Sequence, residues 1–422
     1  MFRKKMLVAL NLLVLLIVLV NLTPPNARAT IWQPWVRLTN DAGFDRSPSV
    51  TQTSDGKIWV VWTGDREAYG GYSRILYMTY DPVSNWTAEK VVAATFDNCT
   101  DSSPSIMQAK NGTIFIAWES NRLNTSIYAH SAIFYSVSNN NGASWSNAKA
   151  LTDNQEENQE PRLFQAANGT IWLVWTKYHG APPLDNYDIF YKTYDGAKWS
   201  PEHQLTTDPL WDVSPSITQT LDGKIWVVWS KIYANNTSDI YYQTYSNNQW
   251  SDVIQLIHGV YTNTNAAICQ MIWGTIWVVY TRTDTENGFS DLWYITSNGT
   301  VWNSPTPLTS ANSDRSDSWP GLFQAKDRGI WLVWASDRFD FVPPDYANWE
   351  LAYQTSKVFP GDVNGDDQVY TYDLAAIGVS YGQQRGSSLY NPAADLNNDG
   401  QVWAEDLAIV GKNFGLGTSP PP

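Results

Sequence analysis

Cysteine, histidine and charge are all scarce in this chain of 422 residues, which has two Cys, four His and 16% charged residues. Two cysteines cannot build a disulfide framework. The repeat described below places Cys99 and Cys269 in distant units, so we expect both thiols to be unpaired. The sequence also contains no zinc motif, no Gly-rich phosphate loop and no recognisable Ser-His-Asp constellation. These absences exclude a disulfide scaffold and leave no motif that names a catalytic nucleophile.

Basic residues are few compared with acidic ones. The 27 Lys and Arg stand against 41 Asp and Glu, for a formal net charge of −14. Removing residues 1–29 would take away four basic and no acidic side chains, which lowers the charge to −18. A chain this acidic does not attract nucleic acid or anionic lipid. We therefore predict neither as a partner.

Long apolar runs are confined to the N-terminus. Residues 3–5 are basic, residues 6–20 are apolar except for Asn11, and 27–29 offer a small-x-small cleavage site. The apolar stretch is shorter than the roughly 20 residues that a spanning helix needs. Residues 1–29 are therefore predicted to be a signal peptide. The mature protein is predicted to be secreted or attached to the cell surface, without a membrane span.

Two segments near the C-terminus place oxygen donors at positions 1, 3, 5, 7 and 12 of a loop. The donor at position 7 is a backbone carbonyl, and the others are side chains. The predicted ligands are Asp362, Asn364, Asp366, Gln368 and Asp373 in the first loop, and Asp395, Asn397, Asp399, Gln401 and Asp406 in the second. Each loop leads into apolar residues at helical spacing. We predict two Ca²⁺ ions, one per loop; the alternative is an acidic, solvated tail.

Two such loop–helix units about 33 residues apart resemble a type I dockerin. The resemblance implies a cohesin-like scaffold domain as partner and folding that depends on calcium. Loop position 6 is Gly400 in the second copy but Asp367 in the first, where the side chain should add strain. Positions 10 and 11, which govern partner choice in dockerins, differ between the copies and from the usual Ser-Thr pair. Calcium-dependent folding is therefore better supported than a standard cohesin partner.

The middle of the chain repeats one unit about every 54 residues. Its core is five apolar residues that end in an aromatic one, at 58–62, 114–118, 171–175, 225–229, 276–280 and 330–334. Such runs predict strands that are covered on both faces. A Ser-Pro-Ser-type strand precedes each run and two strands follow, which is typical of a β-propeller blade.

The last repeat lacks its fourth strand, and residues 35–39 supply a matching one. The predicted fold is mainly β: a six-bladed β-propeller closed by the N-terminal strand, followed by a small α-helical dockerin-like domain with two EF-hand-type loops. The predicted divisions are a signal peptide at 1–29, the propeller at 32–358, the dockerin-like domain at 359–416 and a tail at 417–422.

Residues 138–145, Ser-Asn-Asn-Asn-Gly-Ala-Ser-Trp, are similar to the Asp-box of sialidase-like, BNR-type propellers. The repeats as a whole resemble that superfamily at the level of the fold. For catalysis the resemblance implies an arginine triad, a tyrosine nucleophile with a carboxylate partner, and an acidic aspartate. The usual Arg-Ile-Pro near the first blade is absent, and no nucleophile is assigned.

Two positional series converge on the face that carries the long polar loops. Four residues after the closing aromatic stand Arg66, Arg122, His179, Tyr233, Asp284 and Arg338. Near the start of each unit stand Asp45, Asp101, Asn158, Asp212, Asn263 and Asp317. Neighbouring arginines could bind the carboxylate of a sugar. Alternatively, each arginine pairs with the aspartate of its own blade and only holds the loops together. His179 and Tyr233 break the pattern and join the three arginines as candidate ligand-binding residues.

The leading hypothesis is a secreted propeller that binds or processes extracellular glycan in a setting of polysaccharide breakdown. One alternative is a sialidase-like glycoside hydrolase or lyase, with a carboxylate pair among Asp65, Glu67, Glu119, Asp284 and Asp337. The other is a non-catalytic adhesive or structural surface protein. Most of the 23 Trp occupy fixed strand positions. Trp32, Trp211, Trp273 and Trp319 do not, and are candidates for glycan contact.

Overall fold

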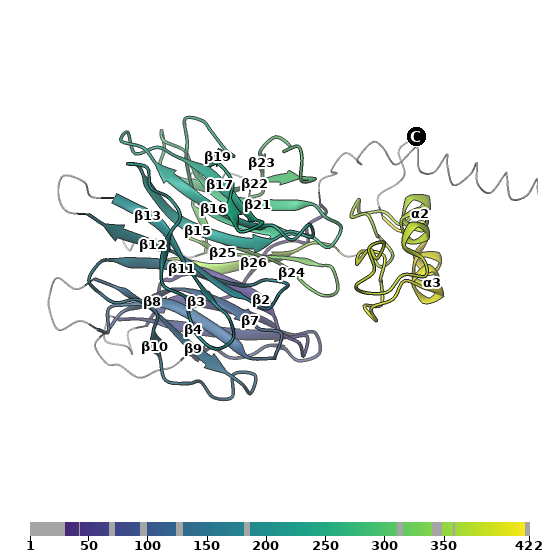
Figure 1. Cartoon of the computed structure of the whole chain (residues 1–422), viewed down its shortest axis with the longest axis horizontal. Helices are drawn as coiled ribbons and strands as arrows, with labels where there is room; N and C mark the ends of the chain where they lie inside the picture. The colour runs from purple at the N-terminus through teal and green to yellow at the C-terminus, as the bar shows by residue number, and fades with distance from the viewer. Residues whose placement is uncertain are drawn as a thin grey trace, which may run out of the picture.

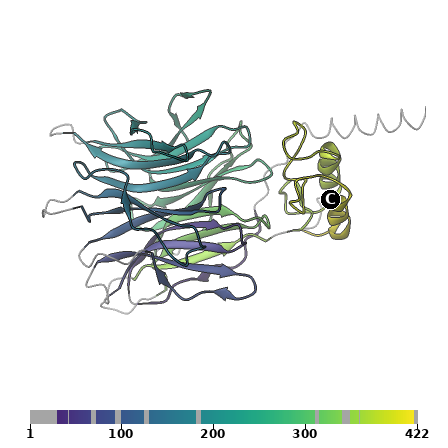
Figure 2. The same cartoon turned by 60° about the horizontal axis from the view of Figure 1, so that its bottom comes forward.

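The computed structural model describes residues 30–41, 43–66, 72–92, 99–123, 130–180, 186–309, 315–339, 348–357 and 359–417. Strands occupy the chain up to residue 355, and two helices follow, α2 (Thr371–Ser380) and α3 (Ala404–Asn413). The strands form a propeller-like β region, and the helical C-terminal unit (residues 359–417) lies against one side of it (Figures 1 and 2). The predicted signal peptide and residues 418–422 of the predicted tail lie outside the described residues.

The strands form five hydrogen-bonded sheets. The first contains β2 (Asp45–Gln52), β3 (Ile58–Asp65), β4 (Ser73–Asp81), β5 (Asn85–Trp86) and β6 (Lys90–Val91). The second contains β7 (Asp101–Gln108), β8 (Ile114–Ser120), β9 (Ala132–Ser138) and β10 (Lys149–Ala150). The third contains β11 (Asn158–Gln165), β12 (Ile171–His179), β13 (Asn186–Tyr194) and β14 (His203–Gln204).

The largest sheet begins with β15 (Trp211–Gln219), β16 (Ile225–Ile232), β17 (Ser238–Ser246), β18 (Gln249–Trp250) and β19 (Ile254–Gln255). It continues with β20 (Thr262–Gln270), β21 (Ile276–Thr283), β22 (Ser290–Ser297) and β23 (Thr306–Pro307). A single parallel pair, Ser238 with Thr262, joins its two halves. The fifth sheet contains β24 (Asp317–Gln324), β25 (Ile330–Ser336), β26 (Glu350–Thr355) and β1 (Val36–Arg37).

The innermost strands close a ring. β2, β7, β11, β15, β20 and β24 contact one another in that order, and β24 returns to β2. β1 pairs antiparallel with β26, with Val36 opposite Tyr353. The predicted closure by the N-terminal strand is therefore confirmed, and it covers what would otherwise be an open sheet edge.

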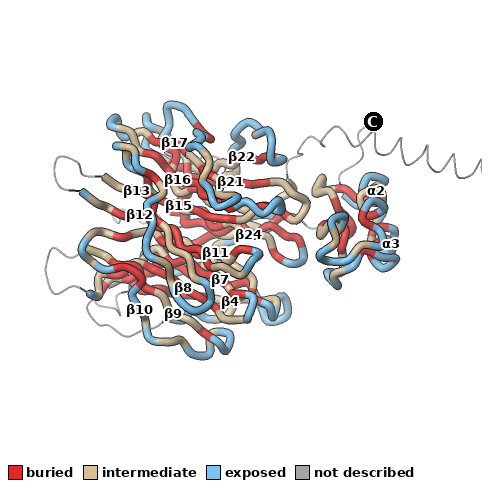
Figure 3. Tube along the Cα trace, in the orientation of Figure 1, coloured by how far each residue is buried: buried red, intermediate tan, exposed pale blue. Residues whose placement is uncertain are grey.

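The predicted apolar runs are the buried second strands of the repeats. Their closing aromatics are fully buried: Trp62, Trp118, Trp175, Trp229, Tyr280 and Trp334. Burial follows these strands (Figure 3). Apolar clusters span neighbouring repeats, as where Trp59 and Val61 pack with Ile114 and Trp118. Packing between repeats therefore supplies the core, and burial of each large side chain contributes about 1.5–3 kcal/mol.

Each innermost strand carries one non-glycine residue with a positive φ at a register shift. These residues are Ser47 (φ 51), Ser103 (φ 52), Glu160 (φ 53), Ser214 (φ 55), Asn265 (φ 53) and Trp319 (φ 55). Such a backbone costs roughly 1 kcal/mol or more per residue. The bulge turns backbone N–H groups toward the preceding repeat, as where Ser103 N donates to Thr63 Oγ1 at 2.9 Å. The same contact with the preceding repeat is made by Glu160 N, Ser214 N and Trp319 N, so four of the six bulges link neighbouring repeats around the hub.

The C-terminal unit has its own apolar core, which includes Val363, Val369, Ile377 and Val410. Trp273, from the hairpin between β20 and β21, packs against this core. The unit therefore sits on the face of the β region that carries the short first-to-second strand hairpins. Neither Cys99 nor Cys269 forms a disulfide in the described part of the chain, as predicted. No helix in the described part of the chain is long and apolar enough to cross a membrane.

Candidate functional site

The face opposite the C-terminal unit, called the rim below, is held by a recurring acid–indole contact. Asp45 Oδ1 accepts a hydrogen bond from Trp62 Nε1 at 2.7 Å. The same contact joins Trp118 to Asp101 (3.0 Å), Trp175 to Asn158 (2.9 Å), Trp229 to Asp212 (2.7 Å) and Trp334 to Asp317 (3.0 Å). Five of the six members of the second positional series therefore anchor a closing tryptophan from inside, and Asn263 does not contact Tyr280 in this way.

The three predicted arginines pair with the aspartates of their own repeats. Arg66 lies 2.9 Å from Asp45, Arg122 lies 2.6 Å from Asp101, and Arg338 lies 2.7 Å from Asp317. Arg66 also pairs with Asp41 (2.9 Å) and Glu89 (2.5 Å), and Arg338 with Asp291 (3.2 Å). The internal Asp–Arg pairing considered from the sequence is confirmed. All three guanidinium groups are engaged within the protein.

The other three repeats carry their cation two residues after the closing aromatic rather than four. Lys231 Nζ lies 3.5 Å from Asp212, and Arg282 Nε donates to Asn263 Oδ1 at 3.3 Å. Lys177 pairs instead with Glu156 at 3.1 Å and Glu202 at 2.6 Å. Sequence reasoning missed these residues. The sequence contained a signal for them. A basic residue stands two positions after the closing aromatic only in the repeats that lack an arginine four positions after it.

Burial dominates the electrostatics of these anchoring acids. Desolvation raises the pKa of Asp45 to about 7, although Arg66 opposes the shift. Desolvation likewise raises the pKa of Asp212 to about 7 against the opposing charge of Lys231. Asp45 and Asp212 are therefore poised to take up protons near neutral pH.

The two pattern-breaking candidates are also engaged. His179 Nε2 lies 2.5 Å from Asp188 Oδ2. Tyr233 Oη donates to Asp239 Oδ2 at 3.0 Å and lies 2.8 Å from Tyr241 Oη. Burial and these two neighbours raise the pKa of Tyr233, which stabilises the neutral phenol. This is the opposite of what an activated tyrosine nucleophile needs.

Aromatic side chains gather on the rim beside these two residues. Trp211 is 43% exposed, and its ring lies 5.1 Å from that of Tyr187, which in turn lies 5.1 Å from Tyr178. Trp211 pairs across the sheet with Ile232, the residue before Tyr233. The other off-pattern tryptophans pack inside the protein: Trp32 on Trp277, Trp319 on Trp349, and Trp273 against the C-terminal unit.

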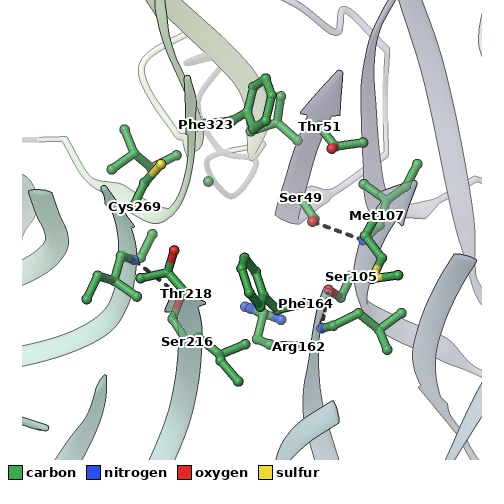
Figure 4. Close-up of a pocket in the computed structure, with 18 of the residues that line it drawn as sticks. Ser49, Thr51, Ser105, Met107, Arg162, Phe164, Ser216, Thr218, Cys269 and Phe323 are labelled. Atoms are coloured by element: carbon green, nitrogen blue, oxygen red, sulfur yellow. Dashed lines mark hydrogen bonds between the residues drawn. The ribbon is translucent and has the colours of Figure 1, made fainter. Parts of the chain in front are cut away.

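A cavity of about 530 Å³ lies in the hub, between the ends of all six innermost strands that lead into the first-to-second strand hairpins (Figure 4). Ser49, Ser105 and Ser216 line it and accept backbone N–H groups from the next repeat. Arg162 also lines it, and burial lowers the pKa of this guanidinium while Glu160 and Glu119 oppose the shift.

Glu119, one of the predicted catalytic carboxylates, is half-buried near the end of β8. Burial raises its pKa, and its two oxygens accept bonds from Ser102 Oγ (2.7 Å) and Glu160 N (2.8 Å). Glu160, which sequence reasoning missed, accepts bonds from Thr176 Oγ1 at 3.0 Å and Ser214 N at 2.8 Å. Both acids therefore clamp neighbouring repeats.

The other predicted carboxylates that the structure describes each have a partner of their own. Asp284 Oδ1 accepts Glu286 N of its own turn at 2.8 Å, and Asp337 Oδ1 accepts Ser316 N at 2.7 Å. Asp65 lies 3.8 Å from Arg46. Glu67 lies outside the described residues.

The two predicted calcium loops share one hydrogen-bond framework. In the first loop (362–373), Asp373 accepts Val363 N at 2.7 Å and Tyr370 N at 2.8 Å. In the second loop (395–406), Asp406 accepts Leu396 N at 2.7 Å and Trp403 N at 2.8 Å. The acid at position 12 thus closes its loop and caps the helix that follows.

The donor set suits a hard cation. The side chains at positions 1, 3 and 5 bond within the loop: Asp362 Oδ1 accepts Gly365 N at 2.7 Å and Asp366 N at 3.3 Å, and Asn364 Nδ2 donates to Asp366 Oδ2 at 3.2 Å. Burial, followed by the charges of Asp373 and Asp366, raises the pKa of Asp362 to about 7. The second loop repeats the arrangement, with Asn397 Nδ2 3.0 Å from Asp399 Oδ2. Carboxylate and amide oxygens at these loop positions, without a thiol or imidazole among them, are the ligand types that Ca²⁺ prefers.

Arg328, in the hairpin between β24 and β25, joins both loops to the β region. Its guanidinium donates to the carbonyl oxygens of Asp362 (3.2 Å) and Asp395 (3.3 Å), and the residue is 8% exposed. The predicted strain at Asp367 is present, with φ +60, and its Oδ2 accepts Ile31 N at 3.0 Å. Sequence reasoning anticipated neither contact.

Residues 360–415 match the dockerin type I domain. The dockerin therefore coincides with the part of the chain that carries both loops and both helices. No curated protein matches the chain.

The β region is similar to solved propeller structures of low sequence identity. A protein of unknown function from Dyadobacter fermentans is 13% identical, with a TM-score of 0.62 over 79% of this chain and 100% of that one. An α-L-arabinanase from Penicillium chrysogenum is 14% identical, with a TM-score of 0.56 over 78% and 97%. The NanB sialidase from Streptococcus pneumoniae is 11% identical, with a TM-score of 0.55 over 78% and 70%. At these identities the likeness shows the fold alone.

Proposed function

We propose that this chain is an extracellular propeller that binds or processes carbohydrate and is attached to a scaffold through its dockerin. The observation that carries the proposal is the dockerin match over residues 360–415, because that domain implies a cohesin partner. The structural likeness to an arabinanase and a sialidase supports carbohydrate as the ligand class. Secretion through the signal at 1–29 belongs to the same proposal.

The ring is proposed to contain six blades. Its six innermost strands contact one another in a closed order, and one parallel pair alone joins the halves of the nine-stranded sheet. Division at that pair gives two blades of the same layout as the others. The Asp-box-like turn at 138–145 fits a structural role, since Gly142 lies directly against the ring of Trp59.

The proposed glycan site is the aromatic group on the rim. An exposed indole supported by other aromatics offers the apolar face on which a sugar ring stacks, and nearby polar groups fix its orientation. Trp211, Tyr187 and Tyr178 supply the aromatic faces. His179 is the next residue after Tyr178, and Tyr233 is the next residue after Ile232, which pairs with Trp211 across the sheet. Both serve as polar neighbours of the aromatic group. Arg66, Arg122 and Arg338 support the loops through their ion pairs.

Two alternatives rest on specific observations. The sialidase-like hydrolase or lyase is supported by the structural neighbours, but the engaged arginines and the raised pKa of Tyr233 count against a sialidase mechanism. The adhesive or structural protein is supported by the complete internal pairing of the rim charges.

The deciding experiment is a glycan array with the full chain in calcium, read for both binding and product release. Trp211→Ala should weaken binding at least tenfold, because it removes the exposed stacking face. Trp403→Ala is the matched control, since this dockerin residue is also 43% exposed. Binding that both variants retain would exclude the aromatic site, and silence on every glycan would favour the adhesive alternative.

The dockerin is proposed to bind two Ca²⁺ ions through Asp362, Asn364, Asp366, Gln368 and Asp373, and through Asp395, Asn397, Asp399, Gln401 and Asp406. Chelation should then unfold residues 359–416 while the propeller stays folded. Hydrogen exchange of the full chain with and without EGTA measures both parts at once. Unchanged protection of both helices after chelation would contradict the proposal.

A further inference from the structure

Three carboxylates meet where the ring closes. Asp41 lies between β1 and β2, Asp45 begins β2 and Glu350 begins β26, and an oxygen of each lies within 4.8 Å of the others. Among the residues that the structure describes, this is the one group of three His, Cys, Asp or Glu at such distances. Asp45 and Glu350 are completely buried. The group is called the seam cluster below.

Several oxygens at this point have no hydrogen-bond donor. Asp45 Oδ2, Glu350 Oε2 and Asn348 Oδ1 are buried and unpartnered. Asn348 belongs to the same place, because its Nδ2 donates to the Asp41 carbonyl at 2.8 Å. A buried carboxylate oxygen without a partner is strongly disfavoured. Three unpartnered oxygens at one seam therefore indicate a ligand that carries positive charge.

The neighbouring arginines leave a charge surplus. Arg66 pairs with Asp41, Asp45 and Glu89, and Arg37 pairs with Glu350 at 2.8 Å. Among the described residues, four carboxylates thus face two guanidinium groups, a formal surplus of two negative charges. One divalent cation would balance this surplus.

We propose that the seam cluster binds one hard divalent cation, with calcium the favoured ion. Asp45 Oδ2, Glu350 Oε2 and an oxygen of Asp41 are the charged ligands, and Asn348 Oδ1 is a neutral one. Oxygen donors alone, three of them carboxylates, suit calcium rather than zinc or copper. The ion joins the segment after β1 to the start of β26, and so fastens the two ends of the ring.

The test counts calcium bound to full chains after dialysis against the same free calcium concentration. Glu350→Gln removes one ligand charge at nearly constant shape. Glu89→Gln is the matched control, because Glu89 also pairs with Arg66 but lies outside the cluster. We expect Glu350→Gln to hold one ion fewer than the wild type, and Glu89→Gln to hold the same number. The dockerin loops are identical in all three proteins. The ions that they bind therefore contribute equally to each count and do not affect the difference between the wild type and a variant.

A second variant keeps the test decisive if Glu350→Gln folds poorly. Asp41→Asn alters a side chain that is 28% exposed and lies outside the strands, and it should also lose one ion. Calcium should raise the melting temperature of the propeller by several degrees in the wild type and in Glu89→Gln, and by less in either seam variant. Equal ion counts in the wild type and the folded seam variants would overturn the proposal.

Discussion

The two loops of the dockerin share a ligand pattern but have different surroundings. The first loop faces the propeller, where Gly365 lies against Trp273. In the second loop, Asn397, Asp399 and Gln401 are exposed. The glycine also occupies a different position in each loop: Gly365 is at position 4 of the first loop, and Gly400 is at position 6 of the second. Ligand spacing therefore predicts the metal chemistry of a loop but not what the loop touches.

Removing the contact that both loops share should have the largest effect. Arg328→Ala leaves two carbonyl oxygens without their charged donor, at about 1.5–3 kcal/mol each. We expect docking of the dockerin to weaken by about 3–5 kcal/mol, with hydrogen exchange in 359–370 at least 100-fold faster. Lys326→Ala is the control, because that side chain bonds to Thr53 and Ser54 instead. Equal exchange in both variants would show that the contact does not hold the dockerin.

The same substitution at the fourth position of each loop should separate the loops. A Cβ on Gly365 would lie 2.6 Å from the ring of Trp273, in a backbone with φ +75. Gly365→Ala should therefore cost about 2–4 kcal/mol from overpacking and strain. Asn398→Ala, at φ +58, should cost about 1 kcal/mol. Chemical denaturation of calcium-loaded protein measures both, and equal costs would mean that the first loop is not docked.

Acidity should stabilise the first loop when metal is removed. The pKa of Asp362 rises from 3.8 to about 7 on folding, chiefly through burial. Between these values the folded state binds more protons than the unfolded chain, so stability is fully present below pH 3.8 and is lost as pH rises through 7. We expect a loss of about 2 kcal/mol, since water entering an ion-free loop reduces the nominal effect. Hydrogen exchange of α2 in calcium-depleted protein at pH 5 and pH 8, corrected for the intrinsic rates, measures it, because acid should restore part of the fold that calcium removal destroys; the opposite sign would contradict it.

Exchanging the residues at position 6 should have the smallest effect. Asp367→Gly relieves strain at φ +60 but loses the bond from Ile31 N, so the change in stability should be under about 1 kcal/mol. Gly400→Asp introduces the strain at φ +89 without a propeller contact to offset it, and should cost about 1 kcal/mol. Paired denaturation curves provide the measurement. A larger loss for Asp367→Gly would show that the Ile31 contact outweighs the strain.

Features set by short-range spacing were predictable from the sequence. The apolar runs predicted the buried second strands because every repeat supplies the same pattern. The pairs of Arg66, Arg122 and Arg338 with their aspartates could be inferred from matched positions within one repeat. The strain at Asp367 followed from its place in the loop.

Features that depend on how distant segments meet were not predictable. Arg328 contacts carbonyls 34 and 67 residues away, and Ile31 meets Asp367 across 336 residues. No local pattern encodes such contacts. The roles of Glu160 and of the bulges were hidden for a related reason, since a positive φ at Ser or Glu leaves no compositional trace.

The closing strand also determines how the molecule would bear tension. A pull on the dockerin enters the propeller through β26, which β25 and β1 flank on both sides. Hydrogen bonds in antiparallel pairs lie across the strand direction. Force along β26 therefore shears two ladders at once and does not open one bond after another. A glycan held on the far rim would load the ring in the direction in which it resists best.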